Sequence, residues 1–265
     1  MSELEVLYEV NDYTATITLN RPEKMNTISA TMLKALTEAF VKANSSPEVR
    51  VVILTGKGRA FCAGLDLTAQ SQGGDEALLD GQRVVTHLDL REAPPIALFE
   101  MDKPVICAMN GSAAGYGLDL ALGCDIRIMS REAKMAAAYV KRGIVPESGG
   151  TWFLPRLIGW SKAAEIIFTG RTLKAEECLN MGLVSRVCEP EEVLPAAQKL
   201  ANEIASNAPL AVQAAKRLMR MGCEETFSTH VHHVFLQLLP LIRTTDFLEG
   251  VKSFIEKRPP KFEGR

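Results

Sequence analysis

The chain has 265 residues, which fits one large domain, or one domain with a helical appendage, and is too long for a disulfide-stapled mini-protein. Its 47% hydrophobic and 23% charged residues are an ordinary globular mixture. The formal net charge of −2 argues against a nucleic-acid partner, which usually requires a basic surface, but leaves room for a small basic patch that binds one phosphorylated molecule.

The six cysteines indicate a reducing compartment. No two of them have the C-x-x-C spacing of a zinc or redox site, and they sit inside apolar runs, as small core residues do. We therefore expect free thiols and a cytoplasmic protein. The acidic, alternating start MSELEVLYEV is not a signal peptide, and no apolar run reaches the roughly 18 residues of a membrane span, so no membrane partner is expected.

The chain opens with a predicted strand pair and a helix. Residues 6–10 and 14–20 alternate apolar and polar side chains, and Asn11 and Asp12 between them are turn residues. Residues 29–43 then carry an apolar stripe at helical spacing, and Ser29 can cap that helix.

Buried strands dominate the next part of the sequence. Residues 50–55, 104–109 and 126–129 are short and largely apolar, which is typical of strands covered on both faces. A helix is expected at about 75–92. The order strand, turn, helix, strand predicts an α/β fold with a mostly parallel sheet.

Beyond residue 160 the periodicity becomes helical. Gly170 provides a stop signal for the first of these helices, and the division between the two parts of the chain is placed near residue 190. The helical ranges are 161–169, 173–181, 191–206, 208–221 and 223–239.

Two turns rich in small residues follow directly on predicted strands, where α/β folds place their ligands. After the turn at 56–64 we expect a helix to begin at about Leu65, with its first N–H groups facing outward. The turn at 110–117 opens an apolar helix and is neither a P-loop nor a G-x-G-x-x-G motif. Tight packing alone explains either turn, but together they can aim two N–H groups at one point, as in an oxyanion hole.

Two carboxyl groups are candidates for proton transfer. Glu147 lies between a proline and the sequence SGG; burial would raise its pKa and suit it to shuttling protons, whereas a solvent-exposed loop explains the same pattern without chemistry. Asp119 lies between two leucines of a predicted apolar helix, where an acid must be paired or functional. Asp125, at the end of that helix, is interpreted as structural.

Other catalytic patterns are weaker. His230, His232 and His233 cluster on a predicted helix without an acid or cysteine at ligand spacing, so no metal site is expected. The sequence has no G-x-S-x-G motif, and neither Ser112 nor Ser148 has a histidine nearby in the sequence, so serine catalysis is not favoured.

Taken in order, these motifs make the chain resemble the crotonase superfamily, the enoyl-CoA hydratases and isomerases, over nearly its whole length. The order and spacing of the matching stretches are more specific than any one of them. They are 18–27 TLNRPEKMNT, 50–68 RVVILTGKGRAFCAGLDLT, 103–128 KPVICAMNGSAAGYGLDLALGCDIRI, 143–159 GIVPESGGTWFLPRLIG, 168–184 FTGRTLKAEECLNMGLV and 249–258 EGVKSFIEKR.

The resemblance implies a spiral of repeated ββα units followed by C-terminal helices that assemble homotrimers, often paired into hexamers. On this basis residues 1–190 form an acyl-CoA-binding core, and residues 191–265 form a helical trimerisation region. The implied substrate is an acyl-CoA thioester. Neither a metal nor a cofactor beyond the CoA of the substrate is expected.

Site residues follow from the resemblance by position. The N–H groups of Leu65 and Tyr116 would hold the thioester carbonyl; many members have glycine where Tyr116 stands, but only its N–H is needed. Phe254 and Lys257 resemble the pair that closes over CoA from a neighbouring subunit. The rest of the CoA would run along Lys24, Met25, Ala63, Gly64, Asp66 and Leu67.

The acids bear on the reaction. Hydratases of this superfamily use two glutamates; Asp119 occupies the first position and Tyr139, which we place among the substrate-binding residues, occupies the second. Glu147 falls where several isomerases and dehalogenases carry their working acid. The hypothesis is that Glu147 removes a proton beside the thioester and returns it at another carbon, while Asp119 assists or positions a water. A plain 2-enoyl-CoA hydratase, an acyl-CoA or C–C hydrolase, and a non-enzymatic RNA- or partner-binding scaffold are the alternatives.

Overall fold

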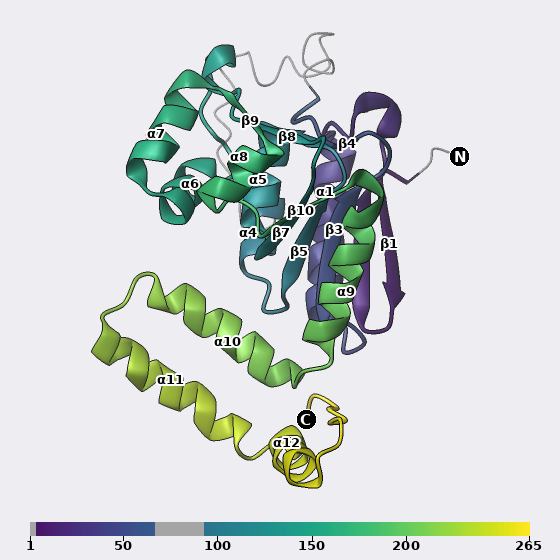
Figure 1. Ribbon diagram of the computed structural model, residues 1–265, viewed down its shortest axis with the longest axis vertical. Helices are drawn as coiled ribbons and strands as arrows, with labels where there is room; N and C mark the ends of the chain where they lie inside the picture. The colour runs from purple at the N-terminus through teal and green to yellow at the C-terminus, as the bar shows by residue number, and fades with distance from the viewer. Residues whose placement is uncertain (1–3, 67–92) are drawn as a thin grey trace, which may run out of the picture.

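A six-stranded sheet forms the centre of the protein, as seen in the computed structural model, which describes residues 4–66 and 93–265 (Figure 1). The first two strands pair antiparallel, and all later neighbours are parallel. This confirms the expected α/β fold with a mostly parallel sheet. In spatial order the strands are β1 (Val6–Asn11), β2 (Thr14–Leu19), β3 (Val51–Gly56), β5 (Val105–Met109), β7 (Ile126–Ser130) and β10 (Arg186–Cys188).

A second sheet of four short strands continues the first. Strands β3, β5 and β7 each run on into a strand of this second sheet, so the chain repeats a ββ unit as it winds. The second sheet consists of β4 (Ala60–Cys62), β6 (Ser112–Ala114), β8 (Lys134–Ala136) and β9 (Thr172–Lys174). The repeat places successive turns of the chain beside one another at the edge between the sheets.

Helices cover both faces of the larger sheet. Alternate residues of β3 and β5 belong to two separate apolar cores, which explains why these strands carry apolar side chains on both faces. One core includes α1 (Ala30–Ser45), whose N-cap Ser29 accepts a hydrogen bond from the N–H of Met32 at 3.0 Å as predicted. The other is closed by α9 (Val193–Ala205).

Shorter helices connect and flank the strands. The predicted helix at 173–181 is wrong in its first turn, because Thr172–Lys174 pairs with β8 and the helix begins only at Ala175. The helix expected at 75–92 lies outside the described residues. The α-helices of this group are α4 (Pro94–Phe99), α5 (Tyr116–Gly123), α6 (Gly150–Ile158), α7 (Trp160–Thr169) and α8 (Ala175–Met181), and the 3-10 turns are η1 (Pro22–Lys24), η3 (Val140–Arg142) and η4 (Pro190–Glu192).

Three C-terminal helices extend away from the sheets: α10 (Pro209–Gly222), α11 (Phe227–Leu241) and α12 (Thr245–Glu256) (Figure 1). Ion pairs tie α10 to the core, with Lys216 Nζ 2.6 Å from Asp125 Oδ2 and Arg217 2.7 Å from Asp102. Helix α9 packs on the sheet, so the part of the chain that projects from the sheets begins at α10. Among the described residues no helix combines the length and the apolar character needed to cross a membrane.

Candidate active site

The two Gly-rich turns meet at the end of the second sheet. Strands β4 and β6 are parallel neighbours, so the segments that leave them run side by side. Gly64 has φ +104° and Gly115 has φ +53°, values that L side chains rarely adopt. A β-carbon on Gly64 would lie 3.1 Å from the carbonyl oxygen of Ala114 and 3.8 Å from the nitrogen of Tyr116. The backbones therefore approach as closely as glycine allows.

Leu65 and Tyr116 present backbone N–H groups at this meeting point. The N–H of Ile28 donates to Gly64 and the N–H of Asp66 donates to Ile28, so Leu65 pairs with Ile28 while its own N–H faces the other side. The expectation of a helix beginning at Leu65 is therefore wrong, because Leu65 instead forms an isolated parallel β-bridge with Ile28. Tyr116 does begin a helix, and its N–H is one of the first groups without an intrahelical acceptor.

Helix α5 is held against β4 by a third glycine. A β-carbon on Gly117 would lie 2.2 Å from the carbonyl oxygen of Cys62, closer than any real contact. The absence of a side chain therefore sets how near the start of α5 comes to the turn that carries Leu65. The side chain of Tyr116 is buried beneath the helix, and burial raises the pKa of its hydroxyl.

Asp119 is a buried acid one turn into α5, with 1% of its surface exposed. Its Oδ1 accepts a hydrogen bond from the Tyr139 hydroxyl, and its Oδ2 accepts one from the N–H of Ser148 at 3.0 Å. Burial, opposed by these hydrogen bonds, raises the pKa of Asp119 from 3.8 to about 6. Tyr139 is itself buried and contacts Asp119 rather than the pocket described next.

Glu147 stands at the mouth of an apolar pocket of about 340 Å³. Its side chain is exposed on one side, and desolvation on the other raises the pKa of its carboxyl. The charge of Glu147 also contributes to the raised pKa values of Tyr116 and Asp119, after burial as the main cause. Glu147 is thus close enough to the start of α5 to interact with it electrostatically.

Aromatic rings form the wall of this pocket. The rings of Phe99 and Trp152 meet edge to face at 5.3 Å, and those of Trp152 and Phe153 at 5.0 Å. Pro95 and Ile96 of α4 continue the apolar lining. Sequence reasoning missed this wall; the available signal was the concentration of bulky side chains directly after the glycines at 149–150.

The residues expected to hold CoA gather beside the turn at 63–66. The N–H of Ala63 donates to the carbonyl of Met25 at 3.0 Å, and Lys24 Nζ lies 3.4 Å from Asp66 Oδ2. Arg21, which sequence reasoning missed, binds the same carboxylate at 2.9 Å. Leu67 lies outside the described residues. Lys24 and Met25 are exposed, so they leave a cation and an apolar side chain beside the turn.

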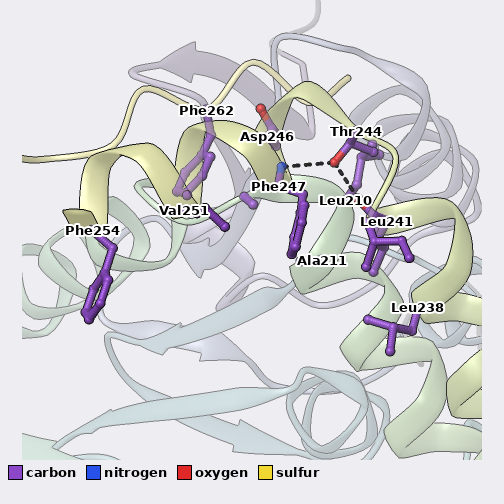
Figure 2. A pocket seen from close by; sticks show the side chains of 13 residues that line it. Leu210, Ala211, Leu238, Leu241, Thr244, Asp246, Phe247, Val251, Phe254 and Phe262 are labelled. Carbon is purple, nitrogen blue, oxygen red and sulfur yellow. Dashed lines mark hydrogen bonds between the residues drawn. The ribbon is translucent and has the colours of Figure 1, made fainter. Parts of the chain in front are cut away.

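Phe254 and Lys257 are not at this site in the single chain. Phe254 is 84% exposed and lines a groove of about 540 Å³ between α10, α11 and α12, and Figure 2 shows the side chains of that groove. Lys257 follows directly at the end of α12 with φ +53°. A CoA contact from these two residues therefore requires a neighbouring subunit.

Two residues of the histidine cluster contact one acid, Glu225. His233 Nδ1 lies 2.9 Å from Glu225, and His230 Nδ1 lies 3.6 Å from the same carboxyl group. Across residues 4–66 and 93–265 no group of three or more potential ligands is arranged to hold a metal ion. All six cysteines carry free thiols.

Comparison with known proteins identifies the family. The family model described as enoyl-CoA hydratase/isomerase matches residues 9–265. The chain belongs to the enoyl-CoA hydratase/isomerase family. This confirms the resemblance to the crotonase superfamily, whose members act on CoA thioesters and need no cofactor beyond the CoA of the substrate.

Individual relatives span the whole chain. The (E)-benzylidenesuccinyl-CoA hydratase of Thauera aromatica is 37% identical over 98% of this chain and 100% of its own length. The short-chain-enoyl-CoA hydratase of Clostridium acetobutylicum is 36% identical over 98% of this chain and 97% of its own. The crystal structure of an enoyl-CoA hydratase from Bacillus anthracis, 35% identical, covers 98% of this chain and 100% of its own with a TM-score of 0.91, which confirms the crotonase fold.

Proposed function

We propose that this enzyme moves protons beside a CoA thioester through an enolate, with Glu147 as the proton carrier. The observation that supports the proposal best is the position of Glu147. It lines an apolar pocket, which suits an acyl group, and the N–H of the next residue, Ser148, is bonded to Asp119 on α5, the helix that begins at Tyr116. The favoured overall reaction is the migration of a carbon–carbon double bond.

Two N–H groups would stabilise the charge that develops in this reaction. As a proton leaves the carbon next to the thioester, negative charge grows on the carbonyl oxygen, which we place between the N–H groups of Leu65 and Tyr116. Each donor of this kind contributes about 3–4 kcal/mol of barrier lowering in known oxyanion holes. Neither group has another hydrogen-bond partner among the described residues. The start of α5 adds the positive end of its helix dipole.

Glu147 would remove the proton and return it at a second carbon of the same acyl chain. Desolvation at the pocket mouth raises its pKa, which brings a carboxylate closer to the basicity that proton abstraction requires. Asp119 would assist without contacting the substrate, because both of its carboxyl oxygens already accept hydrogen bonds from the protein.

The experiment that tests this function is a product analysis with pairs of 2-enoyl-CoA and 3-enoyl-CoA thioesters. We expect the wild-type enzyme to interconvert the two positional isomers, and we expect Glu147→Gln to reduce kcat about 10²–10⁴-fold, the usual contribution of a general base. Mass spectrometry distinguishes an isomerised product from a hydrated one, and deuterium uptake at the α-carbon reports enolate formation. Full activity of Glu147→Gln on every substrate that the wild type converts would refute the assignment.

Hydration of a 2-enoyl-CoA is the second candidate, and the names of the relatives favour it. Both full-length relatives described above are hydratases. A water held by Glu147 would add its oxygen to the β-carbon and give its proton to the Glu147 carboxylate. That proton would then go to the α-carbon of the enolate, which the same two N–H groups stabilise. In the product analysis this function gives a 3-hydroxyacyl-CoA and no double-bond migration, whereas a hydrolase would release free CoA.

We further propose that a neighbouring subunit completes the CoA site, in a homotrimer or a hexamer. Supporting this, α11 has no buried residue in the single chain, and Phe254 and Lys257 lie on α12 away from the turn at 63–66. CoA would then run from the pocket along Lys24, Met25 and Ala63 to the neighbouring α12. The cytoplasmic location also stays a prediction.

A further inference from the structure

The carboxyl group of Asp119 contacts both halves of the candidate active site. Through Oδ2 it holds the N–H of Ser148, the residue after Glu147, and the N–H of Gly150 also stabilises its charged form. Through Oδ1 it holds the hydroxyl of Tyr139. That hydroxyl lies 2.8 Å from the carbonyl oxygen of Gly115, the residue before Tyr116. One acid therefore connects the loop of the proposed base with the turn of the proposed oxyanion hole.

Asp119 is 1% exposed, and neighbouring groups in the described part of the chain cover its carboxyl. A β-carbon on Gly150 would lie 2.4 Å from Asp119 Oδ1, so the backbone of this loop covers the carboxyl directly. Neither Asp119 nor Tyr139 lines the pocket at which Glu147 stands. A water held by two carboxylates would have to displace the bonds to Tyr139 and Ser148, at the cost of leaving buried polar groups without partners.

We propose that Asp119 is a positioning residue, which together with Tyr139 fixes the loop of Glu147 against the turn of Tyr116, and that Glu147 is the only carboxylate that reacts. The assignment rests on the proposed function, because it says how that reaction is divided between the two acids. The contacts that carry it are independent of the reaction.

An asparagine at position 119 can still make the hydrogen bonds that connect the loop with the turn, but it cannot act as a general acid or base. In Asp119→Asn, Oδ1 of the amide accepts from Ser148, while the Nδ2 group donates to the oxygen of Tyr139, whose own proton then goes to the Gly115 carbonyl. In Asp119→Ala all of these bonds are lost. The two substitutions thus separate holding the loop from transferring a proton, since neither variant can donate or accept a proton in the reaction.

The first measurement is kcat and KM for Asp119→Asn and Asp119→Ala on the substrate that wild type converts. We expect Asp119→Asn to keep kcat within about tenfold of wild type, whereas Asp119→Ala loses about 10²-fold, the scale of an effect caused by misplacing a catalytic group by about 1 Å. The acid limb of the pH profile should persist in Asp119→Asn, because it belongs to Glu147. If Asp119→Asn falls as far as Asp119→Ala, by about 10²–10⁴-fold as for a general acid–base, the proposal is wrong.

Lys103→Gln is the control for a general effect of losing a buried charge. Lys103 is 5% exposed, and its Nζ donates to the carbonyl oxygen of Ala43 at 2.7 Å, in a contact that involves no residue of the candidate site. Its kcat should equal that of the wild type. If this control variant lost as much kcat as Asp119→Ala, the effect would reflect a general loss of stability and the proposal would be wrong.

Hydrogen exchange tests the same connection without turnover. The amides of Ser148 and Gly150 should exchange faster in Asp119→Ala, and as slowly as in wild type in Asp119→Asn. If Asp119→Ala does not fold, Tyr139→Phe provides the second variant, with Tyr8→Phe as control, since the Tyr8 hydroxyl has no hydrogen-bond partner within the described residues. Unchanged exchange in all variants overturns the proposal, whereas a wild-type enzyme without activity on any acyl-CoA refutes the proposed function alone.

Discussion

The proposed base, Glu147, lies at the boundary between water and an aromatic wall, and this position should give the activity a pH dependence. As a base Glu147 must be ionised, and burial raises its pKa above the usual value of about 4.3 for a glutamate. The value of kcat/KM should therefore fall as the pH drops through this raised pKa and stay constant above it. A pH profile whose acid limb lies at the ordinary value of a glutamate would contradict this prediction.

Because of Asp119, the free energy of unfolding should fall as the pH rises. A salt-bridged acid would make it rise instead. Its pKa is about 6 in the folded protein and 3.8 when exposed, so the folded state holds the proton more tightly. Stability from this group is present below pH 3.8 and is lost as the pH rises through about 6. Between pH 4 and pH 7, wild type should lose on the order of 3 kcal/mol relative to Asp119→Asn. Urea denaturation at the two pH values measures the difference, and a constant difference would refute the prediction.

Sequence reasoning found both acids but not their environments. Asp119 was recognisable because an acid between two leucines in an apolar helix needs a partner. The partner itself, Tyr139, is 20 residues away and is brought to Asp119 only by the pairing of β6 with β8. For Glu147 the sequence left a solvent-exposed loop open as an explanation, and only the pocket of Phe99, Trp152 and Phe153 beside it favours chemistry.

The contact between α5 and β4 is the element-scale feature on which the geometry of the proposed oxyanion hole depends. Gly117→Ala would place a methyl carbon 2.2 Å from the Cys62 oxygen, so α5 has to move away and take the N–H of Tyr116 with it. We expect a destabilisation of about 1–3 kcal/mol, typical of overpacking, together with a loss of kcat of about 10-fold or more. Thermal unfolding and steady-state kinetics measure the two effects.

Gly182→Ala is a suitable control for that experiment. Gly182 ends α8 with φ +81° and has no atom within 4 Å of the position of a β-carbon. The substitution costs about 1–2 kcal/mol of backbone strain without touching the site. If Gly117→Ala keeps the kcat of wild type while Gly182→Ala shows the same loss of stability, the packing of α5 does not position Tyr116.

Helices and strands could be predicted from the sequence wherever the local residue pattern favours the same structure as the tertiary packing. The largely apolar runs of β3, β5 and β7 identified buried strands, because residues on both faces enter a core. The same reasoning failed at Thr172–Lys174, where pairing with β8 overrides a helical pattern, and at Leu65, where Ile28 supplies a bridge from a distant loop. Both errors come from strand contacts between segments far apart in sequence.

At the scale of the whole molecule, apolar side chains collect on the C-terminal helices. Phe247, Leu248, Val251 and Phe254 on α12 are all exposed in the single chain, and α11 presents a similar surface. Because an exposed apolar patch of this kind marks an interaction site, we expect sedimentation to give a trimer or a hexamer. Leu238→Glu on α11 should shift the protein toward the monomer, whereas Val41→Glu, an exposed apolar position on α1, should not. A monomeric wild type would refute the assembly.

The helix α11 has no buried residue, and under the proposed assembly this would make the activity depend on protein concentration. If another copy covers this helix and lends Phe254 and Lys257 to the neighbouring CoA, then dilution removes a wall of every site at once. Mass action would then lower the specific activity and raise the apparent KM at low enzyme concentration, and would expose α10 to α12 to proteases. High concentrations of an acyl-CoA would oppose both changes, since a ligand held between two copies also holds them together.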